Sequence, residues 1–159
     1  MNDYILYPSP LGTLTVAAEG DALTALVIEG QKYAVQHLDG EGRERETPAL
    51  HQARLWLDRY FAGGCPDPAE LTLSPRGTAF QKRVWRELLN IPYSRTSTYG
   101  ALASRLGSSA RAVGSAVGRN PLSILIPCHR VLGAGGRLCG YAGGLENKEK
   151  LLRLENAAE

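Results

Sequence analysis

The pattern of the chain changes near residue 76, and this change constrains the fold more than any other feature. Before it, residues 4–7, 13–18 and 22–28 form short apolar segments separated by Pro- and Gly-containing turns, which predicts an antiparallel meander. After it, apolar residues recur at helical spacing behind Ser and Thr. Strands followed by helices are typical of an α+β fold. We therefore predict two domains, residues 1–76 and residues 77–159.

The first domain has the features of a scaffold. Thr47 is placed to cap a helix that has Pro48 at its first position and ends at Gly63-Gly64. Residues 29–46 are polar, so we expect a surface loop there, with a short helix near residues 33–38. Nothing in this half predicts chemistry.

The second domain contains a pair of short helices joined by a tight turn. A capping box, Thr78 with Gln81, begins an earlier helix that carries the domain. Residues 97–107 then form a capped helix closed by a glycine, and a second helix runs from Ser109 or Ala110 to Arg119. This arrangement is the helix-turn-helix pattern.

The second helix of that pair carries mostly small side chains. Glycine and alanine allow close approach, either to another helix or to a ligand, and the sequence leaves both interpretations open. Arg111 favours the ligand, because one long basic side chain among small ones suits a narrow groove of a nucleic acid.

Charge is unevenly divided between the two halves. Residues 1–76 hold 6 Lys or Arg against 11 Asp or Glu, whereas residues 77–159 hold 12 against 5. No acidic residue lies between Glu87 and Glu146. A solvated basic surface is the simpler interpretation, but an acid-free segment of this length favours a surface that faces phosphates.

A cysteine stands directly before a histidine at Cys128-His129, behind Pro127 and an apolar segment, residues 124–126, that we interpret as a short buried strand. A free thiol has a pKa near ~8.5, so a reactive cysteine needs a base or a positive environment. His129 and Arg130 are candidates to provide it, with a water carrying the proton, because neighbours in an extended chain point apart. A small buried cysteine without chemistry is the alternative.

The segment from Ile126 to Val131, together with Asn120-Pro121 and residues 141–145, closely resembles the signature of the O6-alkylguanine-DNA alkyltransferases. The resemblance extends from about Thr78 to Glu155, and the first half resembles that family only in its layout. It implies a winged-helix-like helix-turn-helix domain that carries the active cysteine. It also implies irreversible, stoichiometric transfer of an alkyl group from guanine in duplex DNA, after base flipping, to the protein.

The resemblance also assigns catalytic roles to single residues. Cys128 would accept the alkyl group, His129 would take the thiol proton, and Glu155 would hydrogen-bond the histidine. Tyr99 would assist the departing guanine as a hydrogen-bond donor. Glu155 is identified by the resemblance alone, because nothing else separates it from Glu146 or Glu149.

Further residues are expected to bind DNA and the flipped base. Asn120 would hold the helix-turn-helix against the cysteine segment. Ala142 stands where many family members have serine, which removes one expected hydrogen bond of the pocket. The residues expected in the minor groove are Ala110, Arg111, Ala112, Gly114, Ser115 and Arg119, with Arg111 filling the gap left by the extruded nucleotide, and those of the pocket are Tyr141, Ala142 and Gly143.

No cofactor is expected, and no metal, because a zinc site needs paired thiolates and the first half offers only Cys65. No signal peptide or membrane span is recognisable, so we expect a cytoplasmic monomer, associated with the nucleoid if bacterial. Two other classes remain open. A lesion-sensing DNA-binding protein would lack the cysteine, and a Cys-His hydrolase would need an oxyanion hole.

Overall fold

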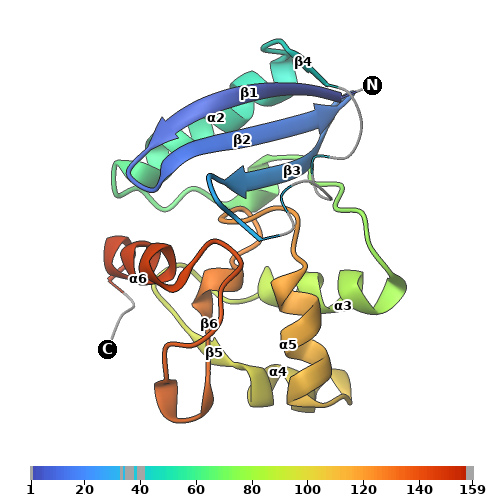
Figure 1. The fold of residues 1–159 in the computed structure, drawn as a ribbon, viewed down its shortest axis with the longest axis vertical. Helices are drawn as coiled ribbons and strands as arrows, with labels where there is room; N and C mark the ends of the chain where they lie inside the picture. The colour runs from blue at the N-terminus through green and yellow to red at the C-terminus, as the bar shows by residue number, and fades with distance from the viewer. Residues whose placement is uncertain (1, 33, 35–37, 39–41, 157–159) are drawn as a thin grey trace. The chain divides into compact units, whose positions relative to one another are not determined.

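The computed structural model describes residues 2–32, 34, 38 and 42–156, and it contains two compact units (Figure 1). The first unit comprises Met1–Arg76 and a later segment, Pro121–Leu125. The second comprises Gly77–Asn120 and Ile126–Glu159. The predicted α+β class is confirmed, because a small, mainly antiparallel sheet with a helix precedes a mostly helical unit.

The sheet of the first unit has the strand order β3-β2-β1-β4. β1 (Asn2–Ser9), β2 (Gly12–Glu19) and β3 (Ala22–Ile28) form the predicted antiparallel meander. β4 (Gly42–Glu44) pairs in parallel with β1, which corrects the expectation of a loop at this point. Its three residues, Gly-Arg-Glu, are exposed and none is hydrophobic, so no pattern of hydrophobicity marked it as a strand. Most of the short helix expected near residues 33–38 lies outside the described residues.

Helix α2 (Pro48–Phe61) covers one face of this sheet, as Figure 1 shows. The Thr47 hydroxyl accepts a hydrogen bond from the Leu50 amide, and Pro48 lacks an amide hydrogen that would need a partner. The apolar side chains of the helix fall on one stripe, which is buried: Leu50, Ala53, Trp56, Leu57 and Tyr60. A 3-10 turn follows at Pro68–Glu70.

β3 is an edge strand of this sheet, and two segments of the same unit cover its outer edge. Leu23 pairs with Leu73, and Leu26 pairs with Leu122. The Leu26 amide donates to the Pro121 carbonyl at 2.9 Å, and the Ser123 amide donates back to Leu26 at 3.1 Å. Pairing of this kind removes the free amides and carbonyls through which edge strands aggregate.

Up to residue 156, the described part of the second unit contains four α-helices and a short parallel ladder. The helices begin where the capping residues predicted, since the hydroxyls of Thr78, Thr98 and Ser109 each accept a hydrogen bond from an amide of the first turn. Gly107, at φ +64°, ends the first helix of the predicted helix-turn-helix. The elements are α3 (Ala79–Leu88), β5 (Ser97–Thr98), α4 (Tyr99–Leu106), α5 (Ala110–Gly118), β6 (Val131–Leu132) and α6 (Leu145–Leu154), with 3-10 turns at Cys128–Arg130 and Ala134–Gly136.

The buried strand predicted over residues 124–126 is wrong. The segment is buried, but Ile124 lies at φ +72°, outside the strand region, and the Leu125 amide donates to the nearby Ser123 carbonyl at 2.8 Å. Cys128 therefore begins a 3-10 turn rather than ending a strand. An apolar run predicts burial, but it does not distinguish a strand from a compact buried turn.

Among the residues that the structure describes, no helix has the length and apolar character needed to cross a lipid bilayer.

Candidate active site

Cys128 is the first residue of a 3-10 turn and is 3% exposed. Burial raises the pKa of its thiol, and hydrogen bonds from Asn120 and Tyr141, with the positive charge of Lys148, act in the opposite direction. The burial effect is the largest, so the resting group is a protonated thiol. A nucleophilic role for Cys128 would therefore require a base to remove that proton.

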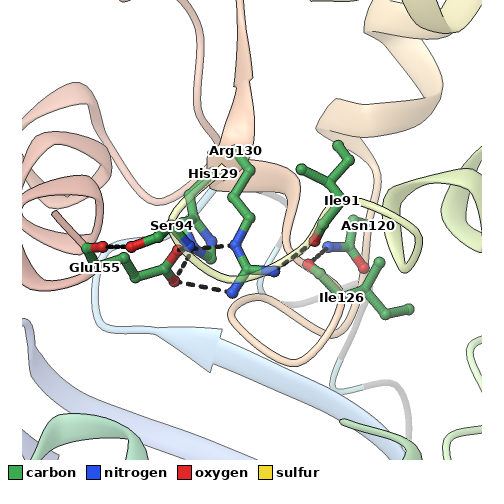
Figure 2. A network of polar contacts seen from close by, with 7 residues as sticks. All are labelled: Ile91, Ser94, Asn120, Ile126, His129, Arg130 and Glu155. Atoms are coloured by element: carbon green, nitrogen blue, oxygen red, sulfur yellow. Dashed lines mark hydrogen bonds and ion pairs between the residues drawn. The ribbon is translucent and has the colours of Figure 1, made fainter. Parts of the chain in front are cut away.

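His129 and Glu155 form a fully buried pair, shown in Figure 2, with His129 Nε2 2.7 Å from Glu155 Oε2. Burial lowers the pKa of His129, against the opposing effect of the carboxylate, so the resting imidazole is neutral. Its Nδ1 atom is buried and has no hydrogen-bond partner among the described residues. With Nε2 donating to Glu155, Nδ1 is the nitrogen that can accept a proton.

Arg130 holds the same carboxylate from a second direction (Figure 2). Its Nε donates to Glu155 Oε1 at 2.8 Å, its Nη2 to Oε2 at 3.1 Å, and its Nη1 to the Ile91 carbonyl at 2.7 Å. The expectation that Arg130 is a candidate positive partner for the thiol is therefore corrected, because its guanidinium pairs with Glu155.

Glu155 is ionised in this network. Burial alone would raise its pKa, but hydrogen bonds and charges from His129 and Arg130 lower the pKa to about 2. The Ser94 amide also donates to Glu155 Oε1 at 3.4 Å, and the Ser94 hydroxyl donates to the Glu155 carbonyl. A carboxylate with a fixed negative charge next to a neutral imidazole favours protonation of that imidazole during a reaction.

Asn120 lies immediately after α5 and its C-cap Arg119. Its Nδ2 donates to the Ile126 carbonyl at 2.9 Å, two residues before the thiol (Figure 2). The side chain is 1% exposed. The predicted contact between the end of the helix-turn-helix and the cysteine segment is therefore present.

A cavity of about 450 Å³ lies along the helix-turn-helix. Its lining brings together three of the predicted DNA-binding residues and the predicted tyrosine, and comprises Thr98, Tyr99, Gly100, Ala110, Arg111, Gly114 and Ala134. Burial, with the charges of Cys139 and Cys128, raises the pKa of Tyr99 to about 12, so its hydroxyl keeps its proton at neutral pH. Tyr99 can therefore donate a hydrogen bond.

The small residues of α5 serve two faces. Val113, Ala116 and Val117 are buried, and the Trp85 indole of α3 donates to the Ala116 carbonyl at 2.8 Å. The opposite face carries all the residues that were predicted to contact a groove. Ala110, Arg111 and Gly114 line the cavity, and Ala112, Ser115 and Arg119 do not. Of these, Ser115 and Arg119 are exposed and Ala112 is half-buried. Helix packing, the first of the two interpretations above, therefore accounts for the inner face only.

The predicted pocket residues Tyr141, Ala142 and Gly143 are half-buried and lie in the loop before α6. Two residues of the site, Ser94 and Lys148, were not identified from the sequence, and neither was the pairing of Arg130 with Glu155. No sequence signal marks them, because the burial that defines their roles arises only in the fold.

No group of three or more His, Cys, Asp or Glu side chains in the described part of the chain is arranged to hold a metal ion. Cys65 is exposed.

Comparison with known proteins gives matches over both halves. Two family models match: "6-O-methylguanine DNA methyltransferase, ribonuclease-like domain" over residues 3–75, and "6-O-methylguanine DNA methyltransferase, DNA binding domain" over residues 79–157. The methylated-DNA–protein-cysteine methyltransferase of Haemophilus influenzae is 44% identical over 154 residues, which are 96% of this chain and 85% of that protein.

The protein of the same name from Mycobacterium leprae is 46% identical over 149 residues, 92% of this chain and 88% of that one. Among solved structures, the crystal structure of Mycobacterium tuberculosis OGT in complex with DNA has a TM-score of 0.87 and 42% identity. The match covers 98% of this chain and 94% of that chain.

Proposed function

Because the chain belongs to the 6-O-methylguanine DNA methyltransferase family, we propose that it repairs DNA by moving an alkyl group from O6-alkylguanine to Cys128. It is a methylated-DNA–protein-cysteine methyltransferase that acts once, because water does not displace the alkyl group from the thioether formed. The observation that carries this proposal is the buried pair of His129 and Glu155 directly after the buried thiol of Cys128. The pair leaves His129 Nδ1 without a hydrogen-bond partner among the described residues.

The reaction begins with removal of the thiol proton. A water carries this proton from Cys128 Sγ to His129 Nδ1, and the Glu155 carboxylate stabilises the imidazolium that forms. Arg130 keeps Glu155 ionised and in place. The resting state is a neutral thiol beside a neutral imidazole, because burial raises the pKa of Cys128 and lowers the pKa of His129.

The thiolate then attacks the alkyl carbon in line with the carbon–oxygen bond. A carbon–sulfur bond forms while the bond to O6 breaks, and its electron pair returns to the guanine. Tyr99, which keeps its proton at neutral pH, donates a hydrogen bond to the departing base. No cofactor takes part in these steps.

Duplex DNA containing the lesion is the partner, and α5 is the helix that enters the minor groove. The DNA complex of the Mycobacterium tuberculosis protein supports this partner. Arg111 lines the same cavity as Tyr99, which supports its insertion where the nucleotide leaves the stack. Small side chains on the outer face allow close approach: Ala110, Ala112, Gly114 and Ser115, with Arg119 reaching a phosphate at the end of the helix.

Asn120 acts as the hinge between α5 and the thiol segment, through its bond to the Ile126 carbonyl. Tyr141, Ala142 and Gly143 form the wall of the base pocket. We assign scaffold and support to residues 1–76, and DNA binding and alkyl transfer to residues 77–159. The protein acts as a monomer in the cytoplasm, at the nucleoid in a bacterium.

The test is the intact mass of the protein after mixing with a duplex that contains one O6-methylguanine. We expect one added methyl group per molecule, mapped to Cys128 by peptide analysis and absent in Cys128→Ala. Tight binding without a mass change would replace this proposal with the lesion-sensing alternative. Neither binding nor transfer would reject both.

A further inference from the structure

Lys148 of α6 is a fully buried lysine, with an exposed fraction of 0%. Its ammonium donates to the carbonyls of Cys139 and Gly140 at 2.9 and 3.0 Å, and it lies 5.9 Å from the centre of the Tyr99 ring. Carbonyl groups and an aromatic face bind a cation without neutralising its charge. The reaction steps proposed above assign no role to this buried charge.

No carboxylate of the described residues lies within ion-pair distance of the Lys148 ammonium, whereas the next lysine of α6 has an ordinary surface pair. Lys150 is 49% exposed in its side chain and lies 3.4 Å from Glu146. Burying a charge costs free energy unless a group of opposite charge compensates it, so an uncompensated buried charge calls for a functional explanation. The groups around Lys148 therefore indicate which ionisation its charge can influence.

The titratable groups that face Lys148 come from three elements. Tyr99 lies at the start of α4, and Cys128 and His129 lie in the 3-10 turn, which packs against α6. Cys139, whose carbonyl accepts from Lys148, lies in the loop before α6. Burial lowers the pKa of Lys148, while the thiols of Cys128 and Cys139 act to raise it. Lys148 is the charged group that acts to lower the pKa of Cys128, and its effect on His129 is the smallest of those acting on that residue. Its positive charge therefore favours ionisation of the Cys128 thiol.

We propose that Lys148 is a positioning residue whose ammonium is the counter-charge of the Cys128 thiolate. The same ammonium fixes the backbone of residues 139–140, which leads directly into the base-pocket loop at Tyr141. One cation thus links the nucleophile and the wall of the pocket. This inference rests on the proposed function, because a counter-charge matters only if Cys128 reacts as a thiolate. The coupling between Lys148 and Cys128 can nevertheless be measured without DNA.

A purely structural lysine would make a different prediction. If Lys148 only holds two carbonyls, its replacement would loosen the loop and lower the melting temperature, but the ionisation of Cys128 would not change. A counter-charge must instead shift the thiol midpoint, because removing a nearby positive charge disfavours the anion. The pH profile of thiol reactivity therefore separates the two roles.

The first experiment measures the rate at which iodoacetamide modifies Cys128 over a series of pH values. The background is Cys65→Ala with Cys139→Ala, so that a single thiol reacts. In Lys148→Met we expect the midpoint of the profile to rise by about one pH unit, which is roughly tenfold less thiolate at neutral pH. Lys150→Met, two residues along the same helix, is the matched control and should leave the midpoint unchanged. An unchanged midpoint in a folded Lys148→Met protein would overturn the proposal.

A second experiment does not depend on the folding of a Lys148 variant. Coupling between two ionisable groups is reciprocal, so a thiolate at Cys128 must hold the Lys148 pKa up by the same amount. We expect nitrogen NMR of the lysine side chains to show a lower Lys148 midpoint in Cys128→Ala than in the unmodified protein. Equal midpoints would contradict the inference. Failure of methyl transfer to DNA, with both midpoint shifts present, would reject the proposed function but not the coupling.

Discussion

The two units place their charges differently. In the first, pairs such as Arg54–Glu46, Arg59–Glu70 and Arg76–Glu19 lie at the surface, and the buried Asp3 pairs with two exposed arginines, Arg43 and Arg45. The second also has surface pairs, but it buries His129, Arg130, Lys148 and Glu155 as well. Surface pairs contribute little to stability, and an apolar cluster of the same volume is often as stable as a buried network. A network kept at such a cost supports the proposal that alkyl transfer takes place beside it, at Cys128.

Each unit also contains one of the two tryptophans, Trp56 in α2 and Trp85 in α3. Replacing one of them by phenylalanine leaves a fluorescence signal that reports on the other unit. The comparison between surface and buried charges can therefore be tested unit by unit.

The largest effect is expected for Glu155→Ala. The substitution leaves Arg130 and His129 buried without their carboxylate, so we expect the free energy of unfolding to fall by about 3–5 kcal/mol. Denaturant unfolding followed through Trp85 measures this. Glu46→Ala is the matched control, because Glu46 also accepts from a histidine and an arginine, but at the surface. Similar losses in the two variants would remove the contrast between the units.

A smaller loss is expected for Arg130→Lys, about 2 kcal/mol by the same measurement. Lysine keeps the charge, but it cannot reach both carboxylate oxygens and the Ile91 carbonyl together. Arg54→Lys provides the comparison in the first unit, because the Arg54 bonds to Glu46 are exposed, and its melting temperature should stay within experimental scatter. A stable Arg130→Lys protein would show that charge alone maintains the network.

Acid should weaken the second unit first. The pKa of His129 is lowered by folding, so between that value and about 6.5 the unfolded chain binds more protons and stability falls as the pH falls. The slope is at most about 1.4 kcal/mol per pH unit for one group. The pKa of Glu155 is about 2 in the folded protein, against an ordinary value of 4.5. Glu155 therefore adds a second loss of stability as the pH falls from 4.5 to about 2. Unfolding of His129→Asn should be flatter below pH 6.5, and an equal slope in both proteins would exclude His129 as the cause.

The smallest effect is expected for Tyr7→Phe in the first unit, about 1 kcal/mol. The Tyr7 hydroxyl donates to Asp58 Oδ1 at 2.6 Å, and burial with this bond raises the pKa of Tyr7. Asp58 is exposed and regains water when the bond is lost, and the ring keeps its contact with Phe61. Unfolding followed through Trp56 measures the change. A loss as large as that of Glu155→Ala would mean that the first unit also depends on a polar contact.

Local signals in the sequence predicted most of the fold. Three helices begin directly after their capping residues, Thr47, Thr78 and Ser109, because each capping hydroxyl accepts from an amide only three residues away. β4 and the turn at Ile124 were not predicted, because parallel pairing with a distant strand and a positive φ leave no local pattern. Pairing between residues distant in the sequence thus limits how much of the secondary structure can be predicted from local patterns.

The candidate site was predictable in part. Cys128 and His129 followed from the chemistry of neighbouring residues, whereas Glu155 required the resemblance to a family, since 26 residues separate it from its partner His129. The burial of Arg130 and Lys148 was not predictable, because the sequence records a basic residue but not the depth at which it lies. The assignments of DNA-contacting residues stay predictions.

The pairing of Pro121–Leu125 with β3 has a consequence for dividing this protein into modules. These five residues belong to the first unit but lie between Asn120 and Ile126, which are bonded to each other in the second. A gene cut after Arg76 would therefore leave Leu26, in the N-terminal fragment, without its partner at the sheet edge. The C-terminal fragment would contain residues 121–125 as an unpaired loop close in sequence to Cys128. Domain exchange between relatives should succeed only when the β3 edge and residues 121–125 are transplanted together.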